Sequence, residues 1–128
     1  MLKEPIQTNK APKAIGAYSQ AIKSGEFLFI SGQIPLNPKT MKIVDSSFED
    51  SAQRVISNIE NTCKEAGASL DDIVKLNIYL LDLENFDILN KIMEKRFSEP
   101  FPARATVEVA RLPKDVMIEM DAIVSITQ

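Results

Sequence analysis

Few of the side chains in this sequence are of the types that commonly catalyse reactions. The chain has no histidine, and Cys63 is its one cysteine. Triads that use histidine as the base and zinc sites of the usual Cys/His type therefore cannot be built. Any catalysis must use carboxylates, lysine, arginine, hydroxyl groups or the backbone. We expect no metal and no cofactor. Arg104 is one candidate that the residues themselves suggest.

Arg104 is placed where it could bind an anion. It follows Pro102 and Ala103 at the start of an expected strand. A guanidinium there can hold a carboxylate through two parallel hydrogen bonds. The alternative is an ordinary surface or interface ion pair with an Asp or Glu, and the residue pattern alone favours this alternative.

Arg104 begins the first of two expected strands, residues 104–110 and 116–125. The Leu-Pro-Lys-Asp segment between them predicts a hairpin. Side chains alternate between the two faces of a strand. In each strand, one set of alternate positions is apolar and suits a buried core. In the first strand this assigns Ala105, Val107 and Val109 to the core face. The other face then carries four charged residues: Arg104, Glu108, Glu119 and Asp121. That face predicts either a subunit interface or a solvated surface with cross-strand ion pairs.

Two amphipathic helices are expected to support these strands. Ser46, with Glu49 three residues later, predicts a capping box at the start of the first helix. Apolar residues then recur at helical spacing, Cys63 among them, and Gly67 fits the position after the helix. Cys63 is therefore expected to be an inert core thiol. The second helix runs from about residue 83 or 85 to 97.

The remaining strands complete an α+β pattern. Residues 18–22 and 27–31 predict a hairpin, and residues 73–81 predict a further strand. Residues 1–14 and 32–40 are expected to be irregular because of their prolines. The order β-β-α-β-α-β-β predicts a two-layer sandwich, with a mixed sheet and both helices on one face.

Length and charge limit the class of protein. A chain of 128 residues is typical of one domain, expected here to span residues 1–128. A net charge of −3 argues against nucleic-acid binding. No signal peptide is apparent and no apolar run is long enough to cross a membrane, so a cytoplasmic protein without a membrane partner is expected.

Five segments resemble a known family. They are IGAYSQAI, FLFISGQIPLNPKT, a helix ending in EAGAS, IVKLNIYLLDLENFDILN and FPARATVEVARLPKDVMIEMDAIV. In this order they resemble the RidA/YjgF family, the reactive-intermediate (imine) deaminases, and the resemblance spans essentially the whole chain. It implies a chorismate-mutase-like fold that assembles as a homotrimer with a central barrel and with clefts between subunits.

The resemblance also implies an activity and a site. The activity is hydrolysis of 2-imino acids, such as 2-iminobutanoate and 2-iminopropanoate, or of their enamine tautomers, to 2-oxo acids and ammonia. Arg104 would clamp the substrate carboxylate, and Glu119 would orient and polarise the attacking water. Thr106 matches a substrate-binding position where many relatives have cysteine, so that thiol is absent here. Four further residues match positions in the cleft: Tyr18, Ser31, Gly32 and Asn90.

Each of these residues also has an ordinary structural alternative. Tyr18 could be a packed aromatic, Ser31 a turn cap, Gly32 a conformational requirement and Asn90 an exposed helix residue. Other functions remain open too. The same cleft could serve a non-catalytic trimer that binds small carboxylates for regulation. Endoribonuclease or translation-inhibitor activity is a weaker alternative, because the chain is acidic and lacks histidine.

Overall fold

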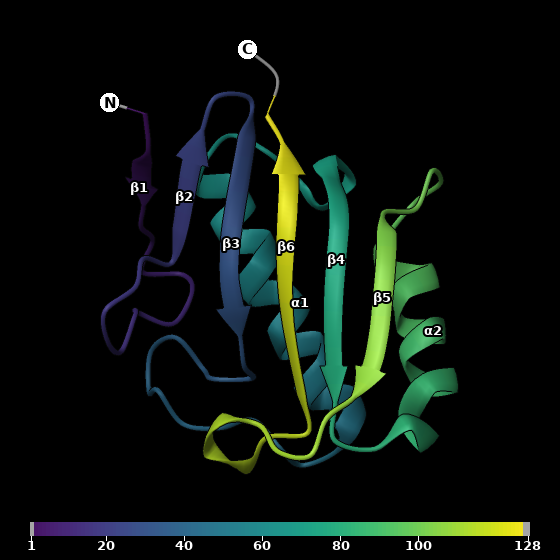
Figure 1. Ribbon diagram of the computed structural model, residues 1–128. Helices are drawn as coiled ribbons and strands as arrows, with labels where there is room; N and C mark the ends of the chain where they lie inside the picture. The colour runs from purple at the N-terminus through teal and green to yellow at the C-terminus, as the bar shows by residue number, and fades with distance from the viewer. Residues whose placement is uncertain (1, 127–128) are drawn as a thin grey trace.

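Residues 2–126, the part of the chain that the computed structural model describes, form a six-stranded β-sheet with two α-helices (Figure 1). The strands lie in the order β1-β2-β3-β6-β4-β5. Only β4 and β5 pair in parallel, so the sheet is mixed, as predicted. The strands are β1 (Glu4–Ile6), β2 (Ala21–Ser24), β3 (Phe27–Gln33), β4 (Ile73–Leu80), β5 (Ala103–Glu108) and β6 (Ile118–Ser125).

Both helices cover the same face of the sheet, which confirms the predicted two-layer arrangement (Figure 1). Helix α1 (Phe48–Glu65) lies behind β3 and β6, and α2 (Phe86–Arg96) lies behind β5. The predicted apolar stripe of α1, including Cys63, is buried against the sheet. Each large aliphatic side chain buried in this way contributes about 1.5–3 kcal/mol. Three short 3-10 helices lie in the connections: η1 (Leu70–Asp72), η2 (Leu83–Asn85) and η3 (Pro113–Asp115).

Helix α1 begins one residue later than predicted. Its N-cap is Ser47, whose hydroxyl oxygen accepts a hydrogen bond from the Asp50 amide at 3.0 Å. The capping box predicted for Ser46 and Glu49 is therefore wrong. Starting at the next serine makes Phe48 the first helical residue, and its side chain is buried in the core. The end of the helix is as predicted, with Gly67 in the left-handed region at φ +79°.

The N-terminal segment contains a strand that the prolines had argued against. β1 pairs with β2 along the edge of the sheet, with Pro5 opposite Ile22. Proline is tolerated in an edge strand because one side of that strand forms no ladder hydrogen bonds. The next two strands form the predicted hairpin, and Gly25 takes a φ of +60° in its turn.

The predicted hairpin between the last two strands is wrong. β4 lies between β5 and β6, and it pairs in parallel with β5 and antiparallel with β6. Helix α2 is the crossover that brings β5 alongside β4 in parallel. Residues 109–117 then pass the end of β4 to reach β6, so the Leu-Pro-Lys-Asp segment lies in a crossing loop rather than a tight turn (Figure 1).

Because β5 pairs with β4 rather than with β6, its side chains point to the opposite faces from those predicted. Arg104 pairs with Leu76 and Thr106 with Ile78, and both partners are buried beneath the helices. Because paired residues share a face, Arg104, Thr106 and Glu108 lie on the helix side. Val107 lies on the open face and is 45% exposed. The sequence analysis placed four charged residues on one face: Arg104, Glu108, Glu119 and Asp121. That prediction is wrong for Arg104 and Glu108, the two residues on β5.

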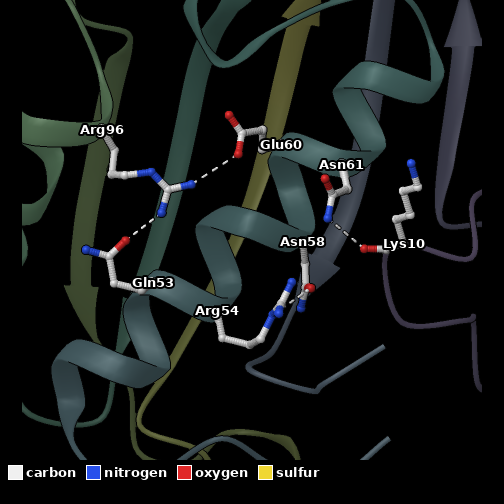
Figure 2. A network of polar contacts seen from close by, with 7 residues as sticks. All are labelled: Lys10, Gln53, Arg54, Asn58, Glu60, Asn61 and Arg96. Atoms are coloured by element: carbon white, nitrogen blue, oxygen red, sulfur yellow. Dashed lines mark hydrogen bonds and ion pairs between the residues drawn. The ribbon is translucent and has the colours of Figure 1, made fainter. Parts of the chain in front are cut away.

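Polar contacts on the flank of α1 tie neighbouring segments together (Figure 2). The Asn58 amide donates to the Leu36 carbonyl at 3.1 Å, and the Asn61 amide donates to the Lys10 carbonyl at 2.8 Å. Arg96 at the end of α2 pairs with Glu60 at 3.3 Å and bonds Gln53 (Figure 2). Within residues 2–126, neither helix has the length and apolar character needed to cross a membrane.

Candidate active site

Glu119 lies on the open face of the sheet, beside an irregularity in β3. Its strand partner on β4 is Tyr79. On the other side, the register of β3 against β6 shifts between Ile30 and Gln33. Gly32 falls within this shift, and a Cβ atom built on it would overlap the Glu119 carboxylate and lie 3.1 Å from its Cδ. The carboxylate therefore packs directly on the Gly32 backbone, which leaves no room for a side chain there.

A cleft of about 440 Å³ opens next to this carboxylate. We call it the Glu119 cleft. It contains four residues singled out in the sequence: Tyr18, Ser31, Gly32 and Glu119. Ile15, Ile34, Pro113 and Lys114 complete its lining. The lining of the cleft thus combines apolar side chains with a few polar groups around one carboxylate, which is typical of sites that bind small molecules.

Hydrogen bonds fix both hydroxyl-bearing residues of the Glu119 cleft. The Ser31 hydroxyl donates to the Ser19 carbonyl at 2.6 Å, so its oxygen remains available as an acceptor. The Tyr18 hydroxyl oxygen accepts from the Ile15 amide at 3.2 Å and keeps its own hydrogen for another partner. Tyr18 is 49% exposed, so it is not a packed aromatic within one copy, and the Ser31 hydroxyl bonds a distant carbonyl rather than capping a turn.

The surroundings of Glu119 disfavour its charge. Burial is the main cause that raises the pKa of Glu119 above the ordinary value of 4.5, and the nearby charge of Asp121 adds to the effect. Within residues 2–126, no hydrogen bond to the Glu119 carboxylate offsets this effect. A half-buried carboxylate with a raised pKa is a stronger base than an ordinary glutamate, which suits it to accept a proton.

Arg104 lies in a second cleft, of about 340 Å³, between the start of β5 and α2. We call it the Arg104 cleft. Asn90 from α2 lines it, as do Met93, Glu94, Phe101 and Pro102. The Arg104 guanidinium lies over the Phe86 ring, with Cζ 5.3 Å from the ring centroid. In the described part of the chain Arg104 makes no ion pair, so the ion pair considered for it in the sequence is not found within one copy.

The two clefts lie on opposite faces of the sheet. Glu119 is on the open face, whereas Arg104 is on the helix side of β5, and β4 separates their strands. The structure thus brings Tyr18, Ser31 and Gly32 to Glu119, and it brings Asn90 to Arg104. It does not bring Arg104 and Glu119 together in one copy.

The comparisons with known proteins agree with this architecture. A family model described as endoribonuclease L-PSP matches residues 8–126. RidA from the Antarctic bacterium Psychrobacter sp. has a crystal structure that aligns with 96% of this chain and 99% of its own, at 46% identity and a TM-score of 0.93. The chain belongs to the RidA/YjgF family.

Relatives in the RidA/YjgF family carry different names. A RutC family protein of Pyrococcus abyssi is 54% identical over 96% of this chain and 97% of its own length. A 2-iminobutanoate/2-iminopropanoate deaminase of Dermatophagoides farinae is 40% identical over 97% of this chain and 97% of its own length. The family and the fold are therefore shown, and the resemblance seen in the sequence motifs is confirmed.

Thr106 lies at the position for which the family resemblance implied a cysteine. It shares the helix side of β5 with Arg104 and faces Ile78 on β4. Its hydroxyl oxygen is buried and has no hydrogen-bond partner within the described residues. A buried hydroxyl without a partner is costly, by about 1–3 kcal/mol. Thr106 does not line the Arg104 cleft, so the structure does not place it among the residues that could contact a ligand there.

Lys114 is a site residue that the sequence analysis missed. It lines the Glu119 cleft from η3, and both Lys114 and Asp115 take positive φ values, 55° and 56°. Residues with side chains rarely adopt this region, and such strain gathers at functional sites. The only signal in the sequence was a lysine between Pro113 and Asp115, shortly before Glu119, in a segment interpreted as a hairpin turn.

Proposed function

We propose that this chain hydrolyses 2-imino acids, such as 2-iminobutanoate and 2-iminopropanoate, or their enamine tautomers, to 2-oxo acids and ammonia. The observation that carries the proposal is Glu119, a half-buried carboxyl group with a raised pKa in a cleft of small-molecule size. The name of the Dermatophagoides farinae relative supports the same activity.

One carboxylate and one guanidinium suffice for this reaction. The protonated imine is already electrophilic at carbon, so the protein needs only to hold it and place a water molecule. Glu119 takes a proton from that water while the water oxygen bonds to the imine carbon. The electron pair of the C=N double bond moves to the nitrogen. The same proton then passes from Glu119 to the nitrogen, which becomes an ammonium group on the same carbon as the new hydroxyl. As the C–N bond breaks, Glu119 takes the hydroxyl proton so that the C=O bond can form, and this proton passes to the departing ammonia, so that a 2-oxo acid and ammonium leave. Arg104 holds the substrate carboxylate throughout.

The complete site forms between two copies of the chain. Arg104 and Glu119 of one copy cannot reach one substrate, because the sheet separates their clefts. Docking of the open face against a neighbouring copy can bring the Arg104 cleft of one to the Glu119 cleft of the other. The open face carries exposed apolar residues for such contact, including Phe29 and Val107. We propose a homotrimer with three such clefts, the assembly that the family resemblance implied.

Hydrolysis is tested directly with imines generated in the assay. A threonine dehydratase supplies 2-iminobutanoate, an amino-acid oxidase supplies 2-iminopropanoate, and semicarbazide traps the imine that remains. The wild type should accelerate release of the 2-oxo acid, and Arg104→Ala should lose the acceleration while keeping its assembly. Arg104→Lys should recover it only partly, because a lysine cannot form the two parallel bonds of a guanidinium.

Mixing two inactive variants tests whether the site is shared. Arg104→Ala keeps Glu119, and Glu119→Gln keeps Arg104. After subunit exchange at equal amounts, three-quarters of the trimers are mixed, and each mixed trimer has one cleft with both native residues. About a quarter of the wild-type activity should therefore return, by the statistics of cyclic assembly. No recovery despite proven exchange would place both residues of a working site within one copy.

Binding without turnover is the main alternative. The Arg104 cleft could recognise the carboxylate of a metabolite for regulation, with no bond broken. Calorimetric titration with 2-oxobutanoate, run beside the imine assay, separates the two. Binding that Arg104→Ala abolishes, together with no acceleration on either imine, would assign the protein to regulation. Ribonuclease activity that co-purifies with the wild type and vanishes in Arg104→Ala would instead favour the activity in the family description.

A further inference from the structure

A second carboxylate, Asp121, lies on the open face next to Glu119. The two residues are two positions apart on β6, so their side chains are neighbours on the same face. Both Asp121 oxygens are held. Oδ1 accepts a hydrogen bond from the Asn77 amide at 2.8 Å, and Oδ2 accepts one from the Tyr79 hydroxyl at 2.8 Å. The proposed reaction gives no role to these three side chains.

Both donors come from β4 and are placed by its register. Asn77 is the strand partner of Asp121, whereas Tyr79 is the partner of Glu119. The Tyr79 hydroxyl therefore bonds Asp121, which lies two positions along β6 from Glu119, the strand partner of Tyr79. The hydrogen bond to Asp121 is the main cause that raises the pKa of Tyr79 to about 12, so this phenol keeps its proton and remains a donor at physiological pH. The Asp121 carboxylate is thus fixed in position.

We propose that Asp121, held by Asn77 and Tyr79, is a positioning residue whose fixed negative charge adds to the effect of burial and so widens the shift in the pH range in which Glu119 works as a base. The inference deepens the proposed imine hydrolysis and rests on it. A like charge nearby disfavours ionisation of a carboxyl group. A carboxylate that ionises closer to neutral pH takes a proton from water more readily, so Asp121 would strengthen Glu119 as a base.

Other groups that face Glu119 do not supply this effect. Tyr18 lines the same cleft with its hydroxyl, and Lys114 lines it with a positive charge that opposes Asp121. Lys75 lies farther along β4, opposite Ile123. Across the open faces of β3, β4, β5 and β6, Asp121 is the only carboxylate besides Glu119. Among these four strands, Asp121 is therefore the source of the negative charge that acts on Glu119.

The test follows Glu119 directly and does not depend on turnover. Side-chain carboxyl carbons of ¹³C-glutamate-labelled protein are titrated by NMR, with Glu119→Gln used to assign the signal. Asp121→Asn should move the Glu119 midpoint to lower pH. Asp71→Asn removes the same charge from an exposed position at the far end of β4 and should leave the midpoint unchanged. Asp121→Ser serves if the Asn variant does not fold.

The pH profile of kcat/KM links the titration to catalysis. In Asp121→Asn the acid limb should move to lower pH by the same amount as the NMR midpoint. An unchanged Glu119 midpoint in both Asp121 variants would overturn the inference. A shifted midpoint in a protein that hydrolyses no imine would uphold the coupling of the two carboxyl groups and overturn the proposed function instead.

Discussion

Glu119 is placed where its charge is unfavourable. Burial and Asp121 raise its pKa, so the folded protein binds the Glu119 proton more tightly than the unfolded chain does. The folded state then loses stability as the pH rises from the unfolded pKa through the folded one, because the native chain holds the extra proton in that range. Below both pKa values this loss is absent.

Glu119→Gln should therefore stabilise the protein while inactivating it. We expect kcat/KM for imine hydrolysis to fall by about 10²- to 10⁴-fold, the usual contribution of a general base. Urea unfolding at a fixed protein concentration should show higher stability than wild type at pH 7 and no gain at an acidic pH where Glu119 is protonated in both states. A variant less stable than wild type at pH 7 would contradict the raised pKa.

Cys63 should be unreactive in the native protein. It is fully buried on α1, and burial is the main cause that raises the pKa of its thiol to about 12. Reaction requires the thiolate and access to it. Alkylating reagents should therefore leave imine hydrolysis unchanged, and an Ellman titration should detect the thiol only after denaturation. Rapid labelling of native protein, or inhibition by the reagent, would contradict this assignment.

At the scale of elements, α1 supports the loop that leads away from the Glu119 cleft. The buried Asn58 side chain donates to the Leu36 carbonyl. Its oxygen also accepts a hydrogen bond from Arg54 (Figure 2). Ile34, two residues before Leu36, lines the cleft. One asparagine thus links the helix to a wall of the site, although the sequence pattern gave it no role.

Asn58→Ala should leave the Leu36 carbonyl buried without a partner. We expect a loss of about 1–3 kcal/mol in the free energy of unfolding, measured with urea. Asn61→Ala is the matched control, because the Asn61 amide also bonds a carbonyl, that of Lys10, but at an exposed position. Its loss should stay within about 0.5 kcal/mol. Equal losses in the two variants would show that burial of the bond is unimportant.

Local patterns predicted the helices well and the pairing of strands less well. The periodic apolar residues of α1 located that helix, because helical contacts are close in sequence. The last hairpin failed because nothing local states that β4 inserts between β5 and β6. That error placed Arg104 on the wrong face. The cleft residues Tyr18, Ser31 and Gly32 were found through family motifs, since no pattern in one sequence marks a β3 irregularity beside a distant carboxylate.

At the scale of the whole molecule, the proposed assembly gives the open face of the sheet the task of completing the site. Phe29 is 45% exposed there, opposite Ile22 and Ile123. Burial of such a surface between copies is the main driving force expected for assembly. One copy alone would present two incomplete clefts.

Phe29→Glu should break the assembly and abolish imine hydrolysis, although Arg104 and Glu119 are unchanged. Light scattering coupled to size exclusion should show the mass of one chain. Ile88→Glu places the same charge at a similarly exposed apolar position, 44% exposed, on the surface of α2 and should keep the assembled mass. An active single chain of Phe29→Glu would refute the shared site.

The separation of Arg104 and Glu119 by the sheet has a genetic consequence. If the clefts form between copies as proposed, each subunit contributes to two of the three sites in a ring. One subunit that assembles normally but lacks both residues disables two sites and leaves one. Where a mutant and a normal allele are expressed together, the fraction of activity lost to such a mutation would exceed the fraction of chains that carry it. A mutation that prevents assembly would instead remove only its own copies.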